Sequence, residues 1–139
     1  MTKVAILGFG TVGSGVAEVL SKNSQGIARR SGGEIQVKYI LDVRDFPDSP
    51  FKDCFVKDFS IIENDPEVDV VVETIGGAKV ALEFTTRALK AGKSVVSSNK
   101  ELVATHGYEL LQLAKANGVS YLFEASVGGG IPILRPLTN

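Results

Sequence analysis

The sequence predicts an α/β fold, a doubly wound parallel sheet of five to six strands with helices on both faces. Two observations carry this prediction. Short apolar runs rich in β-branched residues alternate along the chain with segments whose apolar residues recur at helical spacing. Runs of this kind are typical of strands buried on both faces, and parallel neighbours require a crossover segment between them.

The strands are expected at five short runs in which apolar, β-branched or aromatic residues predominate, namely residues 4–7, 37–41, 68–72, 94–96 and 119–123. A sixth run, 54–56, is too short for the pattern to decide, which leaves the count at five to six. Gly, Pro, Asn and Asp fall between the runs, where they favour turns.

Three segments between these runs show helical spacing, and their apolar stripes are Val12, Val16, Val19 and Leu20; Ala81, Phe84, Thr85 and Ala88; and Leu110, Leu113 and Ala114. The second helix is expected to end at Gly92, which can adopt the left-handed conformation of a helix terminus. The third is expected to begin near Thr105 as N-cap and to stop at Asn117. Segment 21–34 is either an extension of the first helix followed by a turn, or a loop.

The composition excludes several classes of function. The chain has 139 residues, 44% of them hydrophobic and 22% charged, which suits one globular domain plus a short additional element. One cysteine and one histidine exclude an internal disulfide and a Cys/His zinc site. Fifteen basic and sixteen acidic residues leave no broad basic face for nucleic acid. Since no apolar run approaches the ~20 residues of a membrane span, and no targeting signal is evident, we expect a cytoplasmic protein without a membrane partner.

The strongest motif follows the first strand, where the sequence reads Gly8-Phe9-Gly10-Thr11-Val12-Gly13. It matches G-x-G-x-x-G at a strand-to-helix turn, the arrangement of a Rossmann-type dinucleotide site. The first glycine permits the tight turn, the second lets a pyrophosphate approach the backbone, and the third lets helix and strand pack closely. The unpaired N–H groups of the helix start would then face the phosphates.

Charged residues after the second strand bear on the choice of cofactor. Asp42 ends that strand and can accept hydrogen bonds from an adenosine ribose, although it lies further from the glycine motif than the usual ~20 residues. Arg44 can pair with a 2′-phosphate, which Asp42 would repel. Lys57 could add positive charge for NADP, or be an ordinary solvated lysine. The pair of Asp42 and Arg44 therefore predicts NAD, or use of both NAD and NADP.

Small and polar residues follow three further strands, where ligands bind in open α/β sheets. The segments are Glu73-Thr74-Ile75-Gly76-Gly77, Ser97-Ser98-Asn99-Lys100 and 124–130. Gly76 and its neighbour could bring the backbone beside a cofactor, and Lys100 could offer a cation to a carbonyl oxygen or carboxylate. Taken singly, these are also ordinary loop residues.

Four motifs in this order, 8–15, 73–77, 98–100 and 124–133, resemble the amino-terminal half of the homoserine dehydrogenase family. The resemblance covers essentially the whole chain, whereas enzymes of that family continue well beyond it. It implies an NAD(P)-binding domain at residues 1–130 and, at 131–139, the start of a helix from Pro132 that leads into a substrate and dimerisation domain.

The resemblance implies a reversible hydride transfer between NAD(P)H and aspartate 4-semialdehyde, giving homoserine. By position, the glycine loop with Phe9, Thr11 and Val12 would hold the pyrophosphate. Nicotinamide and substrate would lie near five residues, Thr74, Ile75, Gly76, Ser98 and Lys100. Lys100 matches the family's first active-site lysine, while the proton donor and the substrate carboxylates fall beyond Asn139. The chain alone is therefore expected to bind cofactor with little or no turnover.

The resemblance also implies a monovalent cation, such as sodium, held by the backbone carbonyls of Glu124, Val127, Gly129 and Ile131. It further implies a homo-oligomer for the full-length protein, whereas this chain is expected to be a monomer or a weak self-associate. Two other readings stay open at this point. One is a stand-alone nucleotide-binding module without chemistry, and the other is a different semialdehyde dehydrogenase of the same architecture.

Overall fold

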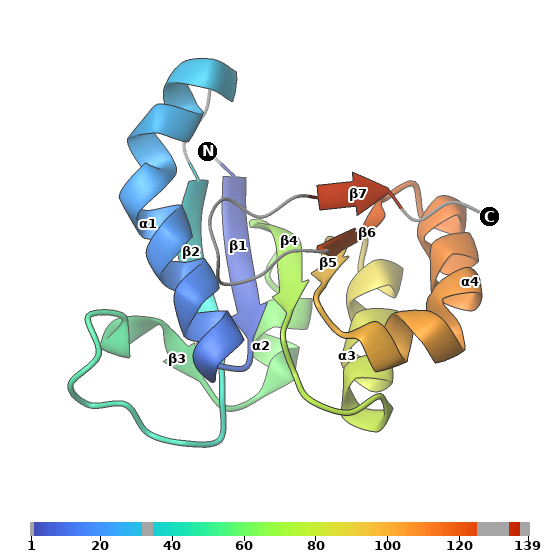
Figure 1. Ribbon diagram of the computed structural model, residues 1–139, viewed down its shortest axis with the longest axis horizontal. Helices are drawn as coiled ribbons and strands as arrows, with labels where there is room; N and C mark the ends of the chain where they lie inside the picture. The colour runs from blue at the N-terminus through green and yellow to red at the C-terminus, as the bar shows by residue number, and fades with distance from the viewer. Residues whose placement is uncertain (1, 32–34, 125–133, 137–139) are drawn as a thin grey trace.

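The computed structural model describes residues 2–31, 35–124 and 134–136, which form one mixed sheet with helices packed on it (Figure 1). The elements in chain order are β1 (Thr2–Leu7), α1 (Thr11–Ser31), β2 (Ile35–Leu41), the short 3₁₀ helix η1 (Lys52–Cys54), β3 (Phe55–Val56), α2 (Phe59–Glu63), β4 (Val68–Glu73), α3 (Lys79–Lys90), β5 (Ser94–Ser97), α4 (Lys100–Ala116), β6 (Tyr121–Glu124) and β7 (Leu134–Pro136).

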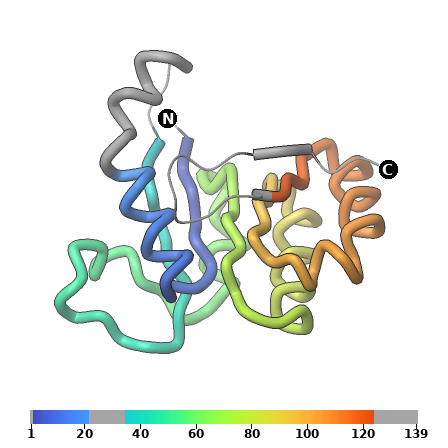
Figure 2. Tube along the Cα trace, viewed as in Figure 1, coloured from blue at the N-terminus to red at the C-terminus, as the bar shows by residue number. Residues whose placement is uncertain are grey.

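The described strands are ordered β3-β2-β1-β4-β5-β6-β7. All neighbours are parallel except β7, which pairs antiparallel with β6. From β1 the chain first builds outward to β2 and β3, then returns to place β4 on the other side of β1. Strands β1 and β4 lie side by side in the trace of Figure 2. Their carboxyl ends therefore mark the point where ligands bind in doubly wound sheets.

Helices cover both faces of the sheet, as predicted. Residues of β1 alternate between two cores, because successive side chains of a strand point to opposite faces. Val4 and Ile6 pack with Val16 and Ala17 of α1. On the other face, Ala5 and Leu7 belong to the core formed with α2, α3 and α4, which contribute Phe59, Ile62, Ala81, Ala88, Leu89, Leu102, Leu110 and Ala114.

The five predicted strands are all present, within two residues of the expected bounds. The undecided run 54–56 divides into the end of η1 at Cys54 and the two-residue strand β3. Helix α2 was not predicted, because five residues are too few to show a period. Its order comes from packing, with Phe59 and Ile62 buried, and from Asp58, whose side chain accepts from the Ser60 N–H.

The start of the third predicted helix is wrong at Thr105, because α4 already begins at Lys100. Its N-cap is Asn99, whose Oδ1 accepts from the Leu102 N–H at 3.0 Å. Thr105 instead lies inside the helix, where its hydroxyl donates to the Glu101 carbonyl at 2.7 Å. Of the two readings of segment 21–34, the helix extension is the one formed, since α1 continues to Ser31.

The helix expected from Pro132 is also wrong over the part that is described, because Leu134–Pro136 forms strand β7. The register pairs Leu122 with Pro136 and Glu124 with Leu134. Proline has no backbone N–H to donate inside a helix, whereas an edge strand tolerates it because one side of that strand needs no donor. The proposed domain boundary at residue 130 is not tested by this pairing and stays a prediction.

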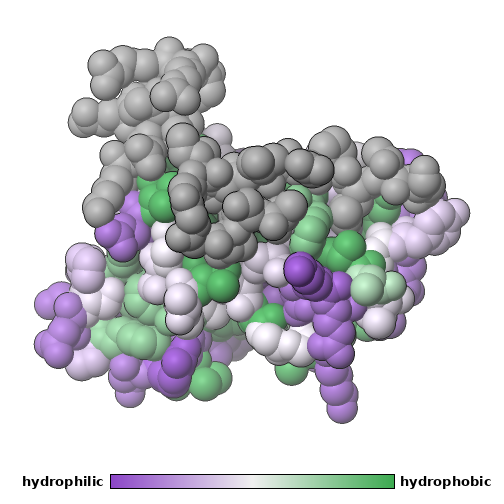
Figure 3. All heavy atoms as spheres, in the orientation of Figure 1, coloured by the Kyte–Doolittle hydropathy of each residue, from purple (hydrophilic) through white to green (hydrophobic). Residues whose placement is uncertain are grey.

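Hydrophilic and hydrophobic residues are interspersed over the described surface that Figure 3 shows. Within the described residues, no helix combines the length and the apolar character that crossing a membrane requires.

Candidate nucleotide-binding site

Most of the predicted cofactor-site residues follow four parallel strands, β1, β2, β4 and β5, and the fold brings these strand ends to one edge of the sheet. Backbone hydrogen bonds tie the strand ends together. The Gly8 N–H donates to the Leu41 carbonyl at 2.7 Å, and the Thr74 N–H donates to the Leu7 carbonyl at 3.0 Å. The Ser98 N–H and hydroxyl both lie 3.1 Å from the Glu73 carbonyl oxygen that accepts from them. The loops after β1, β2, β4 and β5 therefore form one continuous rim.

The glycines of the G-x-G-x-x-G motif have different reasons for lacking a side chain. Gly8 has φ +93°, a conformation that favours glycine. A Cβ on Gly13 would lie 1.9 Å from the Gly8 carbonyl oxygen, so this glycine lets α1 pack against the turn. A Cβ on Gly10 would meet only the Arg44 Nη2, at 4.0 Å. The fold itself therefore does not require a glycine at position 10, and the space beside it is open to a ligand.

The start of α1 offers free backbone donors next to that space. Its first internal hydrogen bond runs from the Ser14 N–H to the Gly10 carbonyl at 2.9 Å. The N–H groups of Gly10, Thr11, Val12 and Gly13 have no acceptor among the described residues. No acidic side chain lies in the first turn of α1. Unpaired N–H groups at a helix start, without a competing carboxylate, attract a phosphate.

Thr74 holds the glycine loop from the neighbouring strand end. Its hydroxyl lies 2.7 Å from the Leu7 carbonyl oxygen and 3.1 Å from that of Gly8. The Thr74 hydroxyl oxygen would also lie 2.9 Å from a Cβ on Gly13. Thr74 is half-buried and faces the turn, so its side chain supports the loop that surrounds the phosphate position.

Asp42 and Arg44 form one unit beside the glycine loop. The Asp42 carboxylate accepts from the Phe9 N–H at 2.8 Å and from the Arg44 N–H at 2.8 Å. It also accepts from the Arg44 Nε at 3.1 Å and Nη2 at 2.9 Å. The Arg44 guanidinium, followed by these backbone donors, holds the pKa of Asp42 well below its usual range. Both carboxylate oxygens are thus engaged, while the Arg44 side chain is 59% exposed.

Lys57 lies at the same rim but is directed to the turn after β2. Its Nζ donates to the Val43 carbonyl at 2.9 Å and pairs with Asp45 at 2.9 Å. Its ammonium is therefore charge-paired with Asp45, and its contacts are with residues 43 and 45.

The loops after β4 and β5 are joined by Asn99, which the sequence analysis placed in a motif without giving it a role of its own. Its Nδ2 donates to the Ile75 carbonyl at 2.9 Å and to the Gly77 carbonyl at 2.6 Å. A Cβ on Gly76 would meet nothing within 4 Å. Lys100 follows Asn99 as the first residue of α4 and is exposed. An asparagine followed by Lys-Glu is an N-cap signal that could have revealed this helix start.

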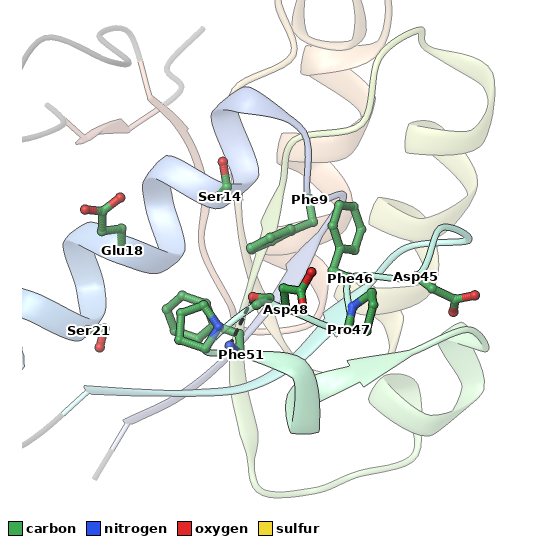
Figure 4. Close-up of a pocket in the computed structure, with 11 residues that line it drawn as sticks. Phe9, Ser14, Glu18, Ser21, Asp45, Phe46, Pro47, Asp48 and Phe51 are labelled. Carbon is green, nitrogen blue, oxygen red and sulfur yellow. Dashed lines mark hydrogen bonds between the residues drawn. The ribbon is translucent and has the colours of Figure 1, made fainter.

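A cavity of about 860 Å³ lies on the outer side of the glycine loop, between α1 and the segment 45–51 (Figure 4). The rings of Phe9, Phe46 and Phe51 line it together with Ser14 and Glu18 of α1. The Phe9 ring packs edge-on against that of Phe46 with centroids 5.0 Å apart. Carboxylates of Glu18, Asp45 and Asp48 border the cavity, which disfavours phosphate there. The free N–H groups of the helix start remain the better place for a pyrophosphate.

The expected cation ligands cannot be placed together. Val127, Gly129 and Ile131 lie outside the described residues, and Glu124 is described only as the last residue of β6. Elsewhere in the described chain, no three His, Cys, Asp or Glu side chains gather as a metal site. The monovalent cation stays a prediction.

The residues present fit a dinucleotide. Gly10 and Gly76 leave room that the fold does not need, the helix start provides unpaired donors, and Arg44 adds a cation. The arrangement can hold a pyrophosphate through backbone groups and a ribose or its phosphate through the pair of Asp42 and Arg44.

Comparison with known proteins agrees with this geometry. The family model described as "Homoserine dehydrogenase, NAD binding domain" matches residues 8–124. Homoserine dehydrogenase from Pseudomonas aeruginosa is 44% identical over 137 residues, which cover 97% of this chain and 31% of the relative. The enzyme of that name from Bacillus subtilis is 41% identical over 140 residues, covering 97% of this chain and 32% of the relative.

Among solved structures, S. aureus homoserine dehydrogenase at pH 8.5 superposes with a TM-score of 0.82 and 37% identity, over 90% of this chain and 32% of that one. The homoserine dehydrogenase from Thiobacillus denitrificans superposes with a TM-score of 0.79 and 38% sequence identity, over 89% of this chain and 29% of that one. The chain thus spans about a third of the length of the relatives it matches. By the extent of the match and the geometry of its glycine loop, the chain belongs to the family of homoserine dehydrogenase NAD-binding domains.

Proposed function

We propose that the chain is the cofactor-binding part of an NAD(P)-dependent homoserine dehydrogenase, which interconverts aspartate 4-semialdehyde and homoserine by hydride transfer. The single observation that carries the proposal is the open space at Gly10, next to four backbone N–H groups without acceptors among the described residues. The names of the relatives support the reaction class. When bound, the cofactor supplies the hydride and accepts it in the reverse direction.

The chain's own residues bind and orient. The N–H groups at the start of α1 hold the pyrophosphate, and Phe9, fixed by Asp42, sets the path of the loop around it. Thr74 keeps the loop closed against β4, while Ile75, Gly76 and Ser98 form the rim on the nicotinamide side. A rim built on strand ends holds its ligand more rigidly than a free loop would.

Lys100 is the proposed contribution of this chain to the reacting end. Its exposed ammonium at the start of α4 would orient the aldehyde oxygen or the substrate carboxylate. Delivery of a proton to the alkoxide needs a further positioned acid, which we assign to the two thirds of the relatives' length outside this chain. The chain alone should therefore bind cofactor with little or no turnover.

We further propose that the site accepts both cofactors and prefers NADP(H). The Asp42 carboxylate is already paired with Arg44. A 2′-phosphate would therefore meet an aspartate whose negative charge is offset by Arg44, together with the exposed part of the Arg44 guanidinium. A 2′-hydroxyl of NAD, in contrast, would have to compete with Arg44 for Asp42. The Lys57 ammonium is paired with Asp45, so the preference rests on Arg44.

Replacing Arg44 with alanine is expected to weaken NADPH binding about 10- to 100-fold, the loss of one or two charge-assisted hydrogen bonds. NADH affinity should stay within about threefold or improve, because Asp42 becomes free to accept from the ribose. Calorimetric titration of each variant with both cofactors measures this directly.

Lys90→Ala is the matched control, since it removes the same charge from an exposed site at the end of α3. It should leave both affinities unchanged. An equal fall in NADPH and NADH affinity for Arg44→Ala would contradict the assignment of Arg44 to the 2′-phosphate.

A further inference from the structure

Glu73, the last residue of β4, is fully buried, an unusual position for a carboxyl group. It lies on the sheet face that α2, α3 and α4 cover, since Val71 two residues earlier belongs to that core. Its Oε1 accepts from the Ser97 hydroxyl at 2.9 Å, and its Oε2 accepts from the Ile75 N–H at 2.7 Å. Burial raises the pKa of Glu73, and no cation lies among its hydrogen-bond partners.

Asn99 completes a circuit with Glu73 through the loop after β4. The Asn99 N–H donates to the Ser97 hydroxyl at 3.2 Å, and its amide nitrogen donates to the Ile75 and Gly77 carbonyls. Glu73 thus holds the N–H of Ile75 while Asn99 holds its carbonyl. The amide oxygen of Asn99 caps α4 at the Leu102 N–H, so the circuit also fixes the helix that begins at Lys100.

The loop that these bonds hold has few contacts of its own. Gly76 and Gly77 are exposed, and a Cβ on either would meet nothing within 4 Å. Gly77 has φ +82°, and glycines have the largest conformational entropy to lose on ordering. Side-chain packing therefore does not order residues 76 and 77. The order comes from the hydrogen bond that Ile75 donates to Glu73 and from those that Asn99 donates to the Ile75 and Gly77 carbonyls.

We propose that Glu73 and Asn99 are positioning residues that hold the 75–77 backbone in place against the nicotinamide half of the cofactor, an assignment that rests on the proposed function. Neither touches the adenosine side, where Asp42, Arg44 and the glycine loop bind. Their removal should therefore weaken a ligand that carries nicotinamide and leave unchanged one that lacks it.

The test compares NADH with ADP-ribose, which is identical except for the nicotinamide. In Glu73→Met, which keeps the volume and removes both acceptors, NADH affinity should fall about tenfold or more, while ADP-ribose affinity stays within about twofold. The change in nicotinamide fluorescence that accompanies NADH binding should be lost in the same variant. Glu73→Gln can still accept from the Ile75 N–H and should restore NADH affinity to within about threefold of the parent chain.

Asn99→Asp provides the second variant. Aspartate keeps an acceptor for the Leu102 N–H, so α4 stays capped, but it cannot donate to Ile75 or Gly77. It should show the same selective loss of NADH binding, and it decides the question if Glu73→Met does not fold. Thr85→Val is the matched control, because it alters a fully buried hydroxyl on α3 that has no partner among the described residues.

The outcomes separate the two claims. If the parent chain binds neither ligand, the proposed function fails, and this assignment with it. If the parent binds both and the Glu73 and Asn99 variants bind NADH equally well, only the positioning role is wrong. An equal loss of NADH and ADP-ribose would show that the two residues support the fold as a whole, which also overturns the proposal.

Discussion

Gly10→Val is expected to abolish cofactor binding while leaving the fold intact. A Cβ at position 10 meets only the end of the flexible Arg44 side chain, at 4.0 Å, so the protein accommodates it. The valine would nevertheless occupy the space where the pyrophosphate approaches the backbone. We expect the affinity for NADPH to fall more than about 100-fold, equivalent to roughly 2.8 kcal/mol or more. Calorimetric titration and a thermal melt of the same sample measure the two effects.

Gly107→Ala is a suitable control for this substitution. Gly107 lies inside α4, away from the glycine loop, and its Cβ would make ordinary contact with Val103 at 3.4 Å. This variant should bind cofactor normally and be up to about 1 kcal/mol more stable, because alanine favours the helix interior. If Gly10→Val binds NADPH as the parent does, the phosphate is not held at this loop.

Gly13→Ala is expected to have the opposite pattern, with a large loss of stability. Its Cβ would lie 1.9 Å from the Gly8 carbonyl oxygen, 2.8 Å from the Gly8 carbonyl carbon and 2.9 Å from the Thr74 hydroxyl. Two of these atoms are backbone, so α1 must move away from the turn. Overpacking of this kind costs about 3 kcal/mol or more. For a chain of this size, that corresponds to a fall of roughly 10 °C in Tm.

Thermal unfolding followed by circular dichroism tests the Gly13 prediction. Cofactor binding should be lost as well, because the N–H groups at the start of α1 no longer converge. A Gly13→Ala variant that melts with the parent would contradict the close contact between helix and turn. The two glycines thus separate what the motif does for the fold from what it does for the ligand.

Much of the fold and of the site follows from local sequence signals. The strands were found because each is a run of β-branched residues buried on both faces, and the glycine loop because its spacing has a specific geometric purpose. Asp42 was selected because ligands bind where parallel strands end, and Thr74 because it also matches the family's motif 73–77 at such a strand end. The structure places both at the rim, bonded to the glycine loop.

The features that sequence reasoning missed depend on contacts distant in the chain. Strand β7 exists through its pairing with β6, and α2 through the burial of two side chains. The burial of Glu73 could not be inferred, because an acidic residue after an apolar run usually faces solvent, whereas the fold buries this one completely. The sequence shows that Asp42 and Arg44 are close in the chain. It does not reveal that the Arg44 guanidinium donates to both oxygens of the Asp42 carboxylate.

The most direct test of the account is a calorimetric titration of this chain with NADPH and NADH, side by side, on a sample shown to be folded by circular dichroism. We predict saturable one-to-one binding of both cofactors, with NADPH the tighter. Binding that favours NADH would overturn the role given to Arg44. No binding of either cofactor by the folded chain would contradict the central claim that its glycine loop is a dinucleotide site.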